Sequence, residues 1–343
     1  MVLCLQIRSA SYSQGGKLLT AKSSSRNMND IPDFEITDKW IVSCRGKKNN
    51  ADPRKPYAWL VEKERTASGT TEDTATIFLT NRECPFHCLM CDLWKNTTDK
   101  SVPVGAIPAQ IEWALNNMPA AKHLKLYNSG SFFDNKAIPV KDYHNIASLI
   151  SNFETVIVES HPFFINEESL RFRDMIKSDL QIAVGLETVN TAILEKINKR
   201  MTLDDFARAV NYLMDHDIFT RAFILLRPPF LSESEGIFWA ERSLDFAFTA
   251  GVECCVIIPV RPGNGAMDLL QEKGLFAAPD IRSLEKVVEY GIEQQAGRVF
   301  ADLWDLKLFS KCDSCLDDRI LRLTEMNLNQ KFSRRIKCTC DTL

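Results

Sequence analysis

The chain has 343 residues, of which 45% are hydrophobic and 25% charged, as is ordinary for a globular protein with a large core. Its formal net charge of -3 gives no overall argument for nucleic-acid binding. No apolar run approaches the roughly 20 residues that cross a bilayer, and eleven cysteines without a secretory signal favour metal ligation in a reducing compartment. We therefore expect a soluble, cytoplasmic protein with no membrane partner.

Two segments precede the predicted core. Residues 1–29 contain no Asp or Glu and are rich in serine, which is the composition of an organelle transit peptide. A disordered extension, here given the bounds 1–39, is the alternative, and Met28 is a candidate start. The lead-in at 40–75 is basic and carries several prolines. It is interpreted either as a solvated segment that packs Tyr57 and Trp59 on the core or as a basic arm for a polyanionic substrate.

Residues 76–300 alternate between short β-rich runs and helical stretches. Six βα units in series predict an α/β fold with a parallel sheet and right-handed crossovers, whereas eight would close a complete barrel. The predicted strands are Thr76–Thr80, Leu124–Asn128, Thr155–Glu159, Gln181–Leu186, Arg221–Leu225 and Glu253–Pro259. The predicted helices include Gln110–Asn117, Asp142–Asn152, Glu167–Ile176, Leu203–His216 and Glu233–Ala250. Residues 301–343 form a C-terminal extension.

Directly after the first predicted strand stands Cys84-Pro-Phe-His-Cys88-Leu-Met-Cys91. A 4Fe-4S cluster held by protein alone takes four thiolates, so three leave one iron without a protein ligand. An open coordination position marks a reactive centre, and a cluster that passes one electron suits radical chemistry. The alternatives are a zinc site with His87 as fourth ligand and three unrelated buried cysteines.

The C-x3-C-x2-C spacing of Cys84, Cys88 and Cys91 resembles the signature of the radical S-adenosylmethionine (SAM) superfamily. The resemblance implies a partial (β/α)6 barrel and a 4Fe-4S cluster whose open iron is chelated by S-adenosyl-L-methionine. It also implies an electron donor such as flavodoxin or ferredoxin. Met90 stands where the superfamily commonly has an aromatic residue, and its polarizable thioether can pack on adenine.

Polar residues follow the other strands at their carboxyl ends, where a parallel βα sheet places function. After the second strand comes Asn128-Ser129-Gly130-Ser131, whose small residues let the backbone approach a ligand. By position, this loop resembles the superfamily's glycine-glycine-glutamate stretch, which binds the methionine amino group.

Two carboxylates, Glu159 and Glu187, end the third and fourth strands. They are candidates to bind ribose hydroxyls or the methionine ammonium, and the alternative is a rim carboxylate paired with Lys or Arg. The resemblance implies that Lys199 binds the methionine carboxylate. The alternative is that Lys199 and the adjacent Arg200 are simply exposed to solvent, as Lys-Arg pairs commonly are.

Two arginines at the ends of the fifth and sixth strands, Arg227 and Arg261, are predicted to look into the cavity and bind a carboxylate or phosphate of the substrate. His161 is the only histidine at a predicted strand end, and we leave it outside the predicted site.

Four further cysteines form two close pairs in the C-terminal extension: Cys312 with Cys315, and Cys338 with Cys340. Two such pairs can complete a closed zinc site or bind an auxiliary iron-sulfur cluster, and the alternative is a tail with idle cysteines. The residues between and after the pairs are the most basic of the chain and are candidates to face nucleic acid.

A closer resemblance is to the elongator-type radical SAM enzymes, within them to the group that forms archaeosine in transfer RNA. It covers residues 57 to about 290 and rests on Cys-Leu-Met-Cys-Asp (88–92), Asn-Ser-Gly-Ser-Phe-Phe-Asp (128–134), Glu-Ser-His-Pro (159–162), Gly-Leu-Glu-Thr-Val-Asn (185–190), Asn-Lys (198–199) and Arg-Pro-Pro-Phe (227–230). It implies a lyase that cleaves a lysine adduct from a modified 7-deazaguanine base.

The hypothesis is a radical SAM enzyme that cleaves SAM reductively to a 5′-deoxyadenosyl radical, which abstracts hydrogen from a modified nucleobase or transfer RNA. One competing class is a non-enzymatic iron-sulfur or zinc protein in electron transfer or partner binding. Another is a nucleic-acid-binding module with structural zinc. A non-enzymatic protein would not need polar residues at all six strand ends.

Overall fold

The structure is a computed structural model and describes residues 35–342; the sequence interpretation of residues 1–29 lies outside the described residues. The strands are β1 (Ala58–Arg65), β2 (Thr71–Phe78), β3 (His123–Tyr127), β4 (Thr155–Ser160), β5 (Asp179–Glu187), β6 (Phe219–Leu226), β7 (Cys254–Pro259) and β8 (Arg298–Ala301). The α-helices are α1 (Asp38–Ser43), α2 (Ala106–Leu115), α3 (Tyr143–Leu149), α4 (Glu167–Met175), α5 (Thr191–Lys196), α6 (Leu203–Met214), α7 (Glu233–Thr249), α8 (Ala266–Glu272), α9 (Ile281–Gln294) and α10 (Leu316–Asn329). Short 3-10 turns include η4 (Pro162–Phe164) and η6 (Asp313–Cys315).

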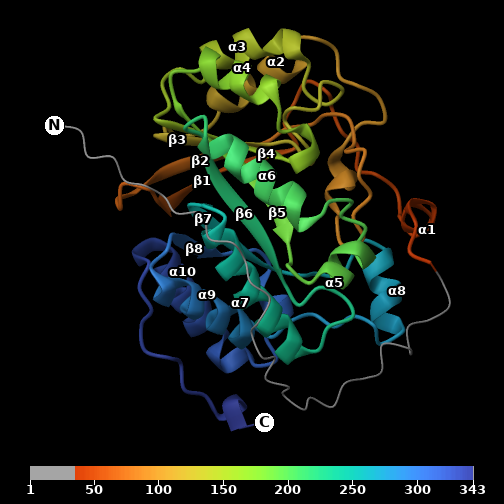
Figure 1. Cartoon of the computed structure of the whole chain (residues 1–343), viewed down its shortest axis with the longest axis vertical. Helices are drawn as coiled ribbons and strands as arrows, with labels where there is room; N and C mark the ends of the chain where they lie inside the picture. The colour runs from red at the N-terminus through yellow and green to blue at the C-terminus, as the bar shows by residue number, and fades with distance from the viewer. Residues whose placement is uncertain (1–34, 343) are drawn as a thin grey trace, which may run out of the picture. The chain divides into compact units, whose positions relative to one another are not determined.

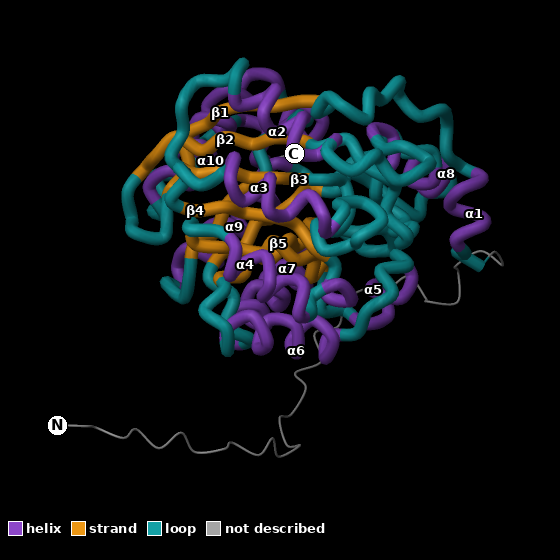
Figure 2. The backbone as a smooth tube through the Cα atoms, turned by 90° about the horizontal axis from the view of Figure 1, so that it is seen from above, coloured by secondary structure: helices purple, strands orange, loops and turns teal. Residues whose placement is uncertain are grey.

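All eight strands form one sheet in the order of the sequence, β1 to β8. The first pair, β1 and β2, is antiparallel, and every later pair is parallel. The sheet curls into a half-barrel, with α2, α3, α4, α6, α7 and α9 ranged around its outside (Figure 1). Because the parallel strands share one direction, the loops after them gather at one end, together with α1, α5 and α8 (Figure 2).

The α/β partial barrel predicted from the sequence is confirmed, and each of the six predicted strands overlaps a parallel strand. The sheet nevertheless has eight strands rather than six. The first, β1, lies in the segment interpreted as a lead-in, and β2 begins at Thr71 rather than Thr76. The last, β8, has only four residues. Both added strands carry charged residues on the inner face of the sheet, which hides them from a search for apolar runs.

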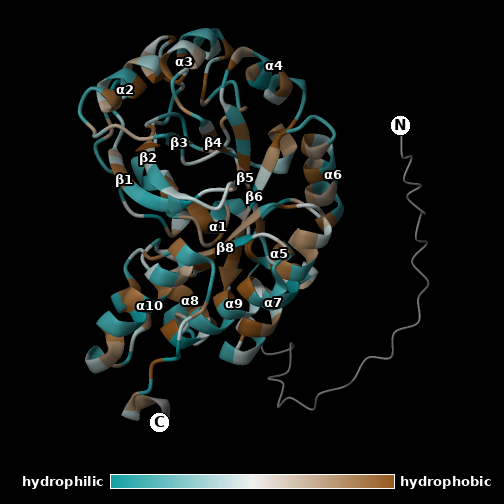
Figure 3. Cartoon of the chain, turned by 90° about the vertical axis from the view of Figure 1, so that its left-hand side faces the viewer, coloured by the Kyte–Doolittle hydropathy of each residue, from teal (hydrophilic) through white to brown (hydrophobic). Residues whose placement is uncertain are grey.

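Side chains alternate between the two faces of each strand. Hydrophobic and hydrophilic residues are mixed along the chain (Figure 3). On the outer face, residues such as Ile77, Leu126 and Val158 are fully buried in the hydrophobic core that the helices cover. On the inner face, charged residues such as Lys125 and Arg221 are also buried. A hydrophobic layer therefore lies between the sheet and its helices, and the charged side chains lie inside the half-barrel.

The inner charged residues form a connected network near the amino ends of the strands. Glu64 accepts hydrogen bonds from both Lys125 and Arg221, with 2.6 Å between Glu64 Oε1 and Arg221 Nη2. Arg221 Nε donates to Gln181 Oε1 at 3.0 Å, and Gln181 Nε2 donates to Glu253 Oε2 at 2.7 Å. Only a cavity of about 130 Å³ remains there. Because each charge is paired, its burial is tolerated.

Candidate active site

The cysteine loop follows β2 at the carboxyl end of the sheet, and two other loops hold it in place. Asn198, after α5, donates from Nδ2 to the His87 carbonyl at 2.7 Å. Asn264, after β7, is buried and donates to the carbonyls of Leu89 and Cys91 at 2.7 and 3.2 Å. These hydrogen bonds fix the backbone of the cysteine loop and involve none of its three thiols. The thiols are therefore available for ligation.

The three thiols of this loop are half-buried, and burial raises the pKa of Cys84, Cys88 and Cys91 to about 12. All three can be thiolates at neutral pH only beside strong positive charge, such as that of bound iron. Among the described residues, one group of cysteines has its sulfurs close enough together to bind a single metal ion, and Cys84, Cys88 and Cys91 do not belong to it. His87, the fourth ligand of the zinc alternative, has Nδ1 3.3 Å from Asp38 Oδ2. The geometry thus disfavours a mononuclear zinc site here.

The loop after β3 packs directly against the first cysteine. A Cβ atom on Gly130 would lie 3.3 Å from Cys84 Cβ, so only glycine fits without displacing its neighbour. Glu159, at the end of β4, accepts hydrogen bonds from the backbone N–H groups of Asn128 and Gly130 at 2.6 and 3.4 Å. Burial raises the pKa of Glu159 to about 7. Its carboxyl group therefore fixes the backbone of the loop after β3.

Two buried side chains, Glu187 and Lys199, form an ion pair with 2.6 Å between Oε1 and Nζ. A bulge at Gly185 and Glu187 interrupts the pairing of β5 with β6, and a Cβ on Gly185 would collide with both charged groups. Burial lowers the pKa of Lys199, but the Glu187 carboxylate outweighs that effect and holds the pKa above its ordinary value. Lys199 directly follows Asn198, whose side chain donates to the His87 carbonyl, so the pair lies beside the cysteine loop.

One buried side chain at this rim lacks hydrogen-bond partners. Asn128 is 0% exposed, and neither its Nδ2 nor its Oδ1 has a partner. An unsatisfied buried amide costs about 1–3 kcal/mol unless another polar group meets it. The amino and carboxylate groups of an amino-acid cofactor are chemically suited to do so. Together with three thiols that suit an iron cluster, this amide makes the residues present fit a cluster and SAM.

Backbone strain also gathers at the rim. Ser129, Glu187 and Arg227 have φ values of 54, 63 and 55°, in the left-handed region that residues other than glycine rarely adopt. They stand at or just after the ends of β3, β5 and β6. Such strain persists where surrounding contacts fix it, commonly at binding sites. For example, the Tyr57 hydroxyl lies 3.2 Å from Ser129 Oγ.

The two predicted substrate arginines are both engaged by protein groups. Arg227 Nη1 donates to Glu233 Oε2 at 2.6 Å and to the Ala278 carbonyl at 2.9 Å. Arg261 Nη2 donates to Asp302 Oδ2 and to the Trp304 carbonyl at 2.7 and 2.6 Å. Acidic and carbonyl acceptors thus engage part of each guanidinium group, whereas the buried Arg261 Nε has no hydrogen-bond partner among the described residues. That Arg227 and Arg261 bind a substrate anion stays a prediction, and such an anion would have to compete with these protein acceptors.

His161 has a positioning role. Its ring stacks on Phe86 with 3.9 Å between centroids. Nδ1 accepts from the Phe163 N–H at 3.2 Å, so Nε2 is the nitrogen that donates to the Lys199 carbonyl at 3.0 Å. Burial lowers the pKa of His161 to about 4. This neutral ring links the cysteine loop to Lys199 and is not poised as an acid.

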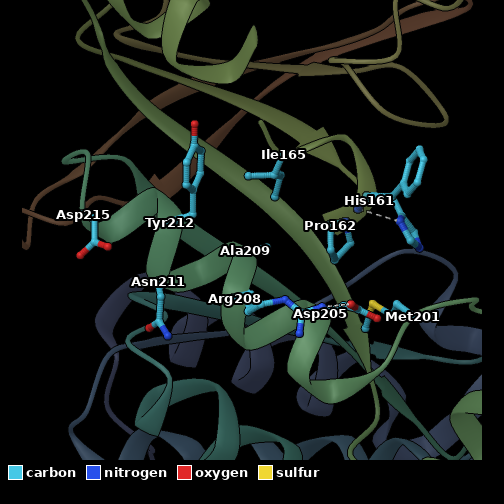
Figure 4. A pocket seen from close by; sticks show the side chains of 11 residues that line it. His161, Pro162, Ile165, Met201, Asp205, Arg208, Ala209, Asn211, Tyr212 and Asp215 are labelled. Atoms are coloured by element: carbon cyan, nitrogen blue, oxygen red, sulfur yellow. Dashed lines mark hydrogen bonds and ion pairs between the residues drawn. The ribbon is translucent and has the colours of Figure 1, made fainter. Parts of the chain in front are cut away.

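A cavity of about 570 Å³ opens behind His161, between η4 and α6 (Figure 4). It is lined by side chains such as Pro162, Met201 and Tyr212, and by none of the three cysteines. It is therefore distinct from the site at the carboxyl ends of the strands.

The four C-terminal cysteines also converge: all four sulfurs of Cys312, Cys315, Cys338 and Cys340 lie within 4.8 Å of one another. The basic residues around them are less available than the sequence indicates. Arg319 and Arg322 are 3% and 2% exposed and pair with Glu285 and Glu289. These two arginines are internal and do not face nucleic acid.

A curled parallel sheet that presents three cysteines, a strained small-residue loop and a buried Glu–Lys pair at one rim is the framework of a cofactor-dependent enzyme. Residues 78–234 match the family model described as the Radical SAM superfamily. The match identifies a radical SAM domain over a little under half of the chain. The protein is a radical SAM enzyme, and the family implies a 4Fe-4S cluster and SAM.

Its relatives are archaeal. A protein of Methanocaldococcus jannaschii without an assigned function is 26% identical over 259 residues, which cover 71% of each chain. Archaeosine synthase subunit beta of Methanosarcina acetivorans is 24% identical over 64% of this chain and 67% of its own length. The protein of the same name from Thermococcus kodakarensis is 29% identical over 35% of this chain and 39% of its own.

The chain is also similar to solved structures, at low identity and with TM-scores below 0.5. An archaeal Elp3 from Methanocaldococcus infernus has a TM-score of 0.48 and 13% identity, over 64% of this chain and 58% of that one. Methylornithine synthase has the same TM-score and identity, over 74% of this chain and 82% of its own. At these scores neither structure adds to the family match.

Three residues of the rim were not predicted as part of the site: Tyr57, Asn198 and Asn264. Each acts through a contact with a loop that is distant in sequence, so no local spacing marks it. The motif Asn198-Lys199 was the one available signal, because it belongs to the resemblance with the elongator-type enzymes. No helix within residues 35–342 is long and apolar enough to span a membrane.

Proposed function

We propose that this protein cleaves SAM reductively at a 4Fe-4S cluster and uses the resulting 5′-deoxyadenosyl radical to abstract hydrogen from a modified nucleobase, free or in transfer RNA. The observation that carries the proposal is the convergence of the cysteine loop, Gly130 and the Glu187–Lys199 pair at one rim. In this proposal Cys84, Cys88 and Cys91 hold the cluster. A flavodoxin or ferredoxin supplies the electron.

The remaining rim residues bind and orient SAM. Lys199 binds the methionine carboxylate, and Glu187 accepts from a ribose hydroxyl or the methionine ammonium. The unpartnered Asn128 amide meets the amino-acid end of the cofactor. Met90 is half-buried within the cysteine loop and packs on adenine. Glu159 acts indirectly: it fixes the backbone of residues 128–130, which in turn contact the cofactor.

The substrate class rests on two observations. Two relatives carry the name archaeosine synthase subunit beta, which denotes formation of a modified nucleobase. In addition, aromatic rings line the rim at β1, β2 and β8: Phe78 lies 5.6 Å from Tyr57 and 6.3 Å from Trp304, between ring centroids. Trp304 is 56% exposed. An exposed indole is a stacking surface for a planar base, worth about 1–3 kcal/mol per base.

The test begins with the anaerobically reconstituted, reduced protein and SAM. It should show the broad visible absorption of a 4Fe-4S cluster and form 5′-deoxyadenosine, faster when the correct nucleobase or transfer RNA is added. Cys88→Ala should abolish both signals without unfolding the chain. Cys44→Ala, a half-buried cysteine outside both clusters of cysteines, is the matched control and should retain them.

Glu187→Ala separates cluster binding from cofactor binding. The cluster absorption should persist, while 5′-deoxyadenosine formation falls by on the order of 100-fold, because misplacement of a reactant by about 1 Å has such effects. A full cluster in Cys88→Ala would refute the ligand assignment. If cluster-replete, reduced wild-type protein neither binds SAM nor forms 5′-deoxyadenosine, the proposed reaction is wrong.

A further inference from the structure

The C-terminal extension places four sulfurs around a common centre. Cys312 Sγ lies 3.8 Å from Cys338 Sγ, and Cys315 Sγ lies 3.7 Å from Cys340 Sγ. Four thiolates around one zinc ion, at a Zn–S distance of about 2.3 Å and tetrahedral angles, stand about 3.8 Å apart. A 4Fe-4S cluster binds each cysteine to a different iron and so requires wider separations. The spacing matches a single ion.

The surroundings of the four sulfurs are those of a closed site. Arg319 Nε donates to Cys315 Sγ at 3.3 Å, while its Nη1 donates to Glu285 Oε2 at 2.5 Å. Arg282 Nη1 donates to the Cys340 carbonyl at 3.1 Å. Donors to sulfur and to the adjacent backbone orient metal ligands and offset their negative charge. Four protein ligands leave no position for a substrate, so the site is structural.

The two cysteine pairs come before and after α10 in the sequence and meet in space at its start. Cys312 and Cys315 belong to the turn that leads directly into α10, which begins at Leu316. The chain returns after α10 and brings Cys338 and Cys340 back to that start. Arg322, on α10, pins the returning segment by donating to the carbonyls of Ser333 and Arg334 at 3.1 and 3.2 Å. An ion held by all four thiolates would close this loop covalently around the helix.

The helix itself caps an open edge of the sheet. Gln330, just after α10, accepts from the Val299 N–H at 2.7 Å and donates to its carbonyl at 2.9 Å. Asn327 makes the same two contacts with Ala301, at 2.8 and 2.9 Å. These side-chain amides thus satisfy the free backbone groups of β8, the last strand, as a ninth strand would. The helix also contacts β1, at the opposite edge of the half-barrel.

We propose that Cys312, Cys315, Cys338 and Cys340 bind one zinc ion that clasps α10 across the gap between β8 and β1. Binding converts the thiols to thiolates and releases their protons to water, so zinc affinity rises with pH. The clasp keeps the Asn327 and Gln330 amides on β8 and thereby closes the side of the half-barrel. It is independent of the radical chemistry proposed above.

The test measures zinc and iron separately in the full-length protein and follows amide hydrogen exchange. Wild type and Cys44→Ser should hold one zinc per chain, and Cys312→Ser/Cys338→Ser almost none. In the double variant the amides of Val299 and Ala301 should exchange at least about tenfold faster, since the cap opens locally. The amides of Leu124 and Leu126, in the centre of the sheet, are the internal reference and should be unchanged.

Two further measurements keep the proposal testable if the double variant fails to fold. Wild type stripped of zinc by a chelator should show the same local increase in exchange, and added zinc should reverse it. Asn327→Leu should retain zinc yet expose the Ala301 amide. Iron in place of zinc, zinc retained by the double variant, or unchanged exchange at Val299 and Ala301 would overturn the clasp. Faster exchange throughout the sheet would also overturn it, because the ion would then hold the whole fold.

Discussion

At the scale of the residue, Gly185 shows how one missing side chain makes room for a charged pair. Its position on β5 faces the inside of the half-barrel, where any Cβ would collide with Glu187 Oε1 and Lys199 Nζ. The glycine therefore permits the bulge that turns Glu187 toward Lys199. Its φ is not in the left-handed region, so the requirement is for space and not for conformational freedom.

Gly185→Ala should separate the Glu187–Lys199 pair. We expect the free energy of unfolding to fall by about 1–3 kcal/mol, as for other overpacked sites. SAM should also bind at least about tenfold more weakly, because the pair loses its geometry. Chemical denaturation and calorimetric titration with SAM measure the two effects. Gly46→Ala, at an exposed position with nothing within 4 Å, is the control. Unchanged SAM affinity in Gly185→Ala would show that the pair does not contact the cofactor.

At the scale of the element, the cysteine loop has little regular structure and depends on its neighbours. The loop after β7 holds it through Asn264, and the loop after α5 holds it through Asn198 and the Ile197 carbonyl, which accepts from the Leu89 N–H at 2.9 Å. Both supports come from the carboxyl rim of the same sheet. The rim thus fixes the thiols in space before any metal binds.

Asn264→Ala should weaken this support. The change leaves the buried Leu89 carbonyl without its donor, which costs about 1–3 kcal/mol, and the loop should become more mobile. We expect the reconstituted cluster to be lost to a chelator several-fold faster, as followed by its visible absorption under anaerobic conditions. Asn49→Ala, which removes an exposed amide contact to Asn96, is the control. Equal rates of loss in wild type and Asn264→Ala would mean that the ligands alone fix the loop.

At the scale of the whole molecule, the charged network inside the half-barrel ties β1 to strands far along the sheet. Burial would raise the pKa of Glu64, but the nearby Arg221 and Lys125 outweigh it and hold the pKa far below its ordinary value of 4.5. A carboxyl group with a lowered pKa stabilises the fold above its unfolded pKa. This contribution is lost as the pH falls below about 5.

Glu64→Gln should therefore lower stability at pH 7 and flatten its dependence on pH. Leaving Arg221 and Lys125 without their shared carboxylate costs about 3–5 kcal/mol at neutral pH. Between pH 6 and 3 the variant should lose less further stability than wild type, in urea unfolding at each pH. The control, Glu72→Gln, removes an exposed pair with Lys122 worth about 0–1 kcal/mol. Parallel pH profiles for wild type and Glu64→Gln would contradict the role assigned to the network.

The sequence by itself determined the α/β class, six of the strands and the superfamily, because these depend on local patterns. Buried parallel strands read as apolar runs, and three thiols within eight residues mark a ligand loop wherever it lies. The spacing of the last four cysteines also predicted a shared site, because two close pairs can complete one metal site, and their four sulfurs do converge.

Only the tertiary structure decided where the remaining charged side chains point. Arg227 and Arg261 stand at strand ends as predicted, yet Glu233 and Asp302 engage their guanidinium groups. The strands β1 and β8 were missed because their half-buried charged residues, such as Glu64 and Arg298, pair with residues far away in sequence. A charged residue reads as exposed in a linear pattern, and its partner becomes known only when the chain has folded. Burial of charge depends on that partner, which is why these features required the structure.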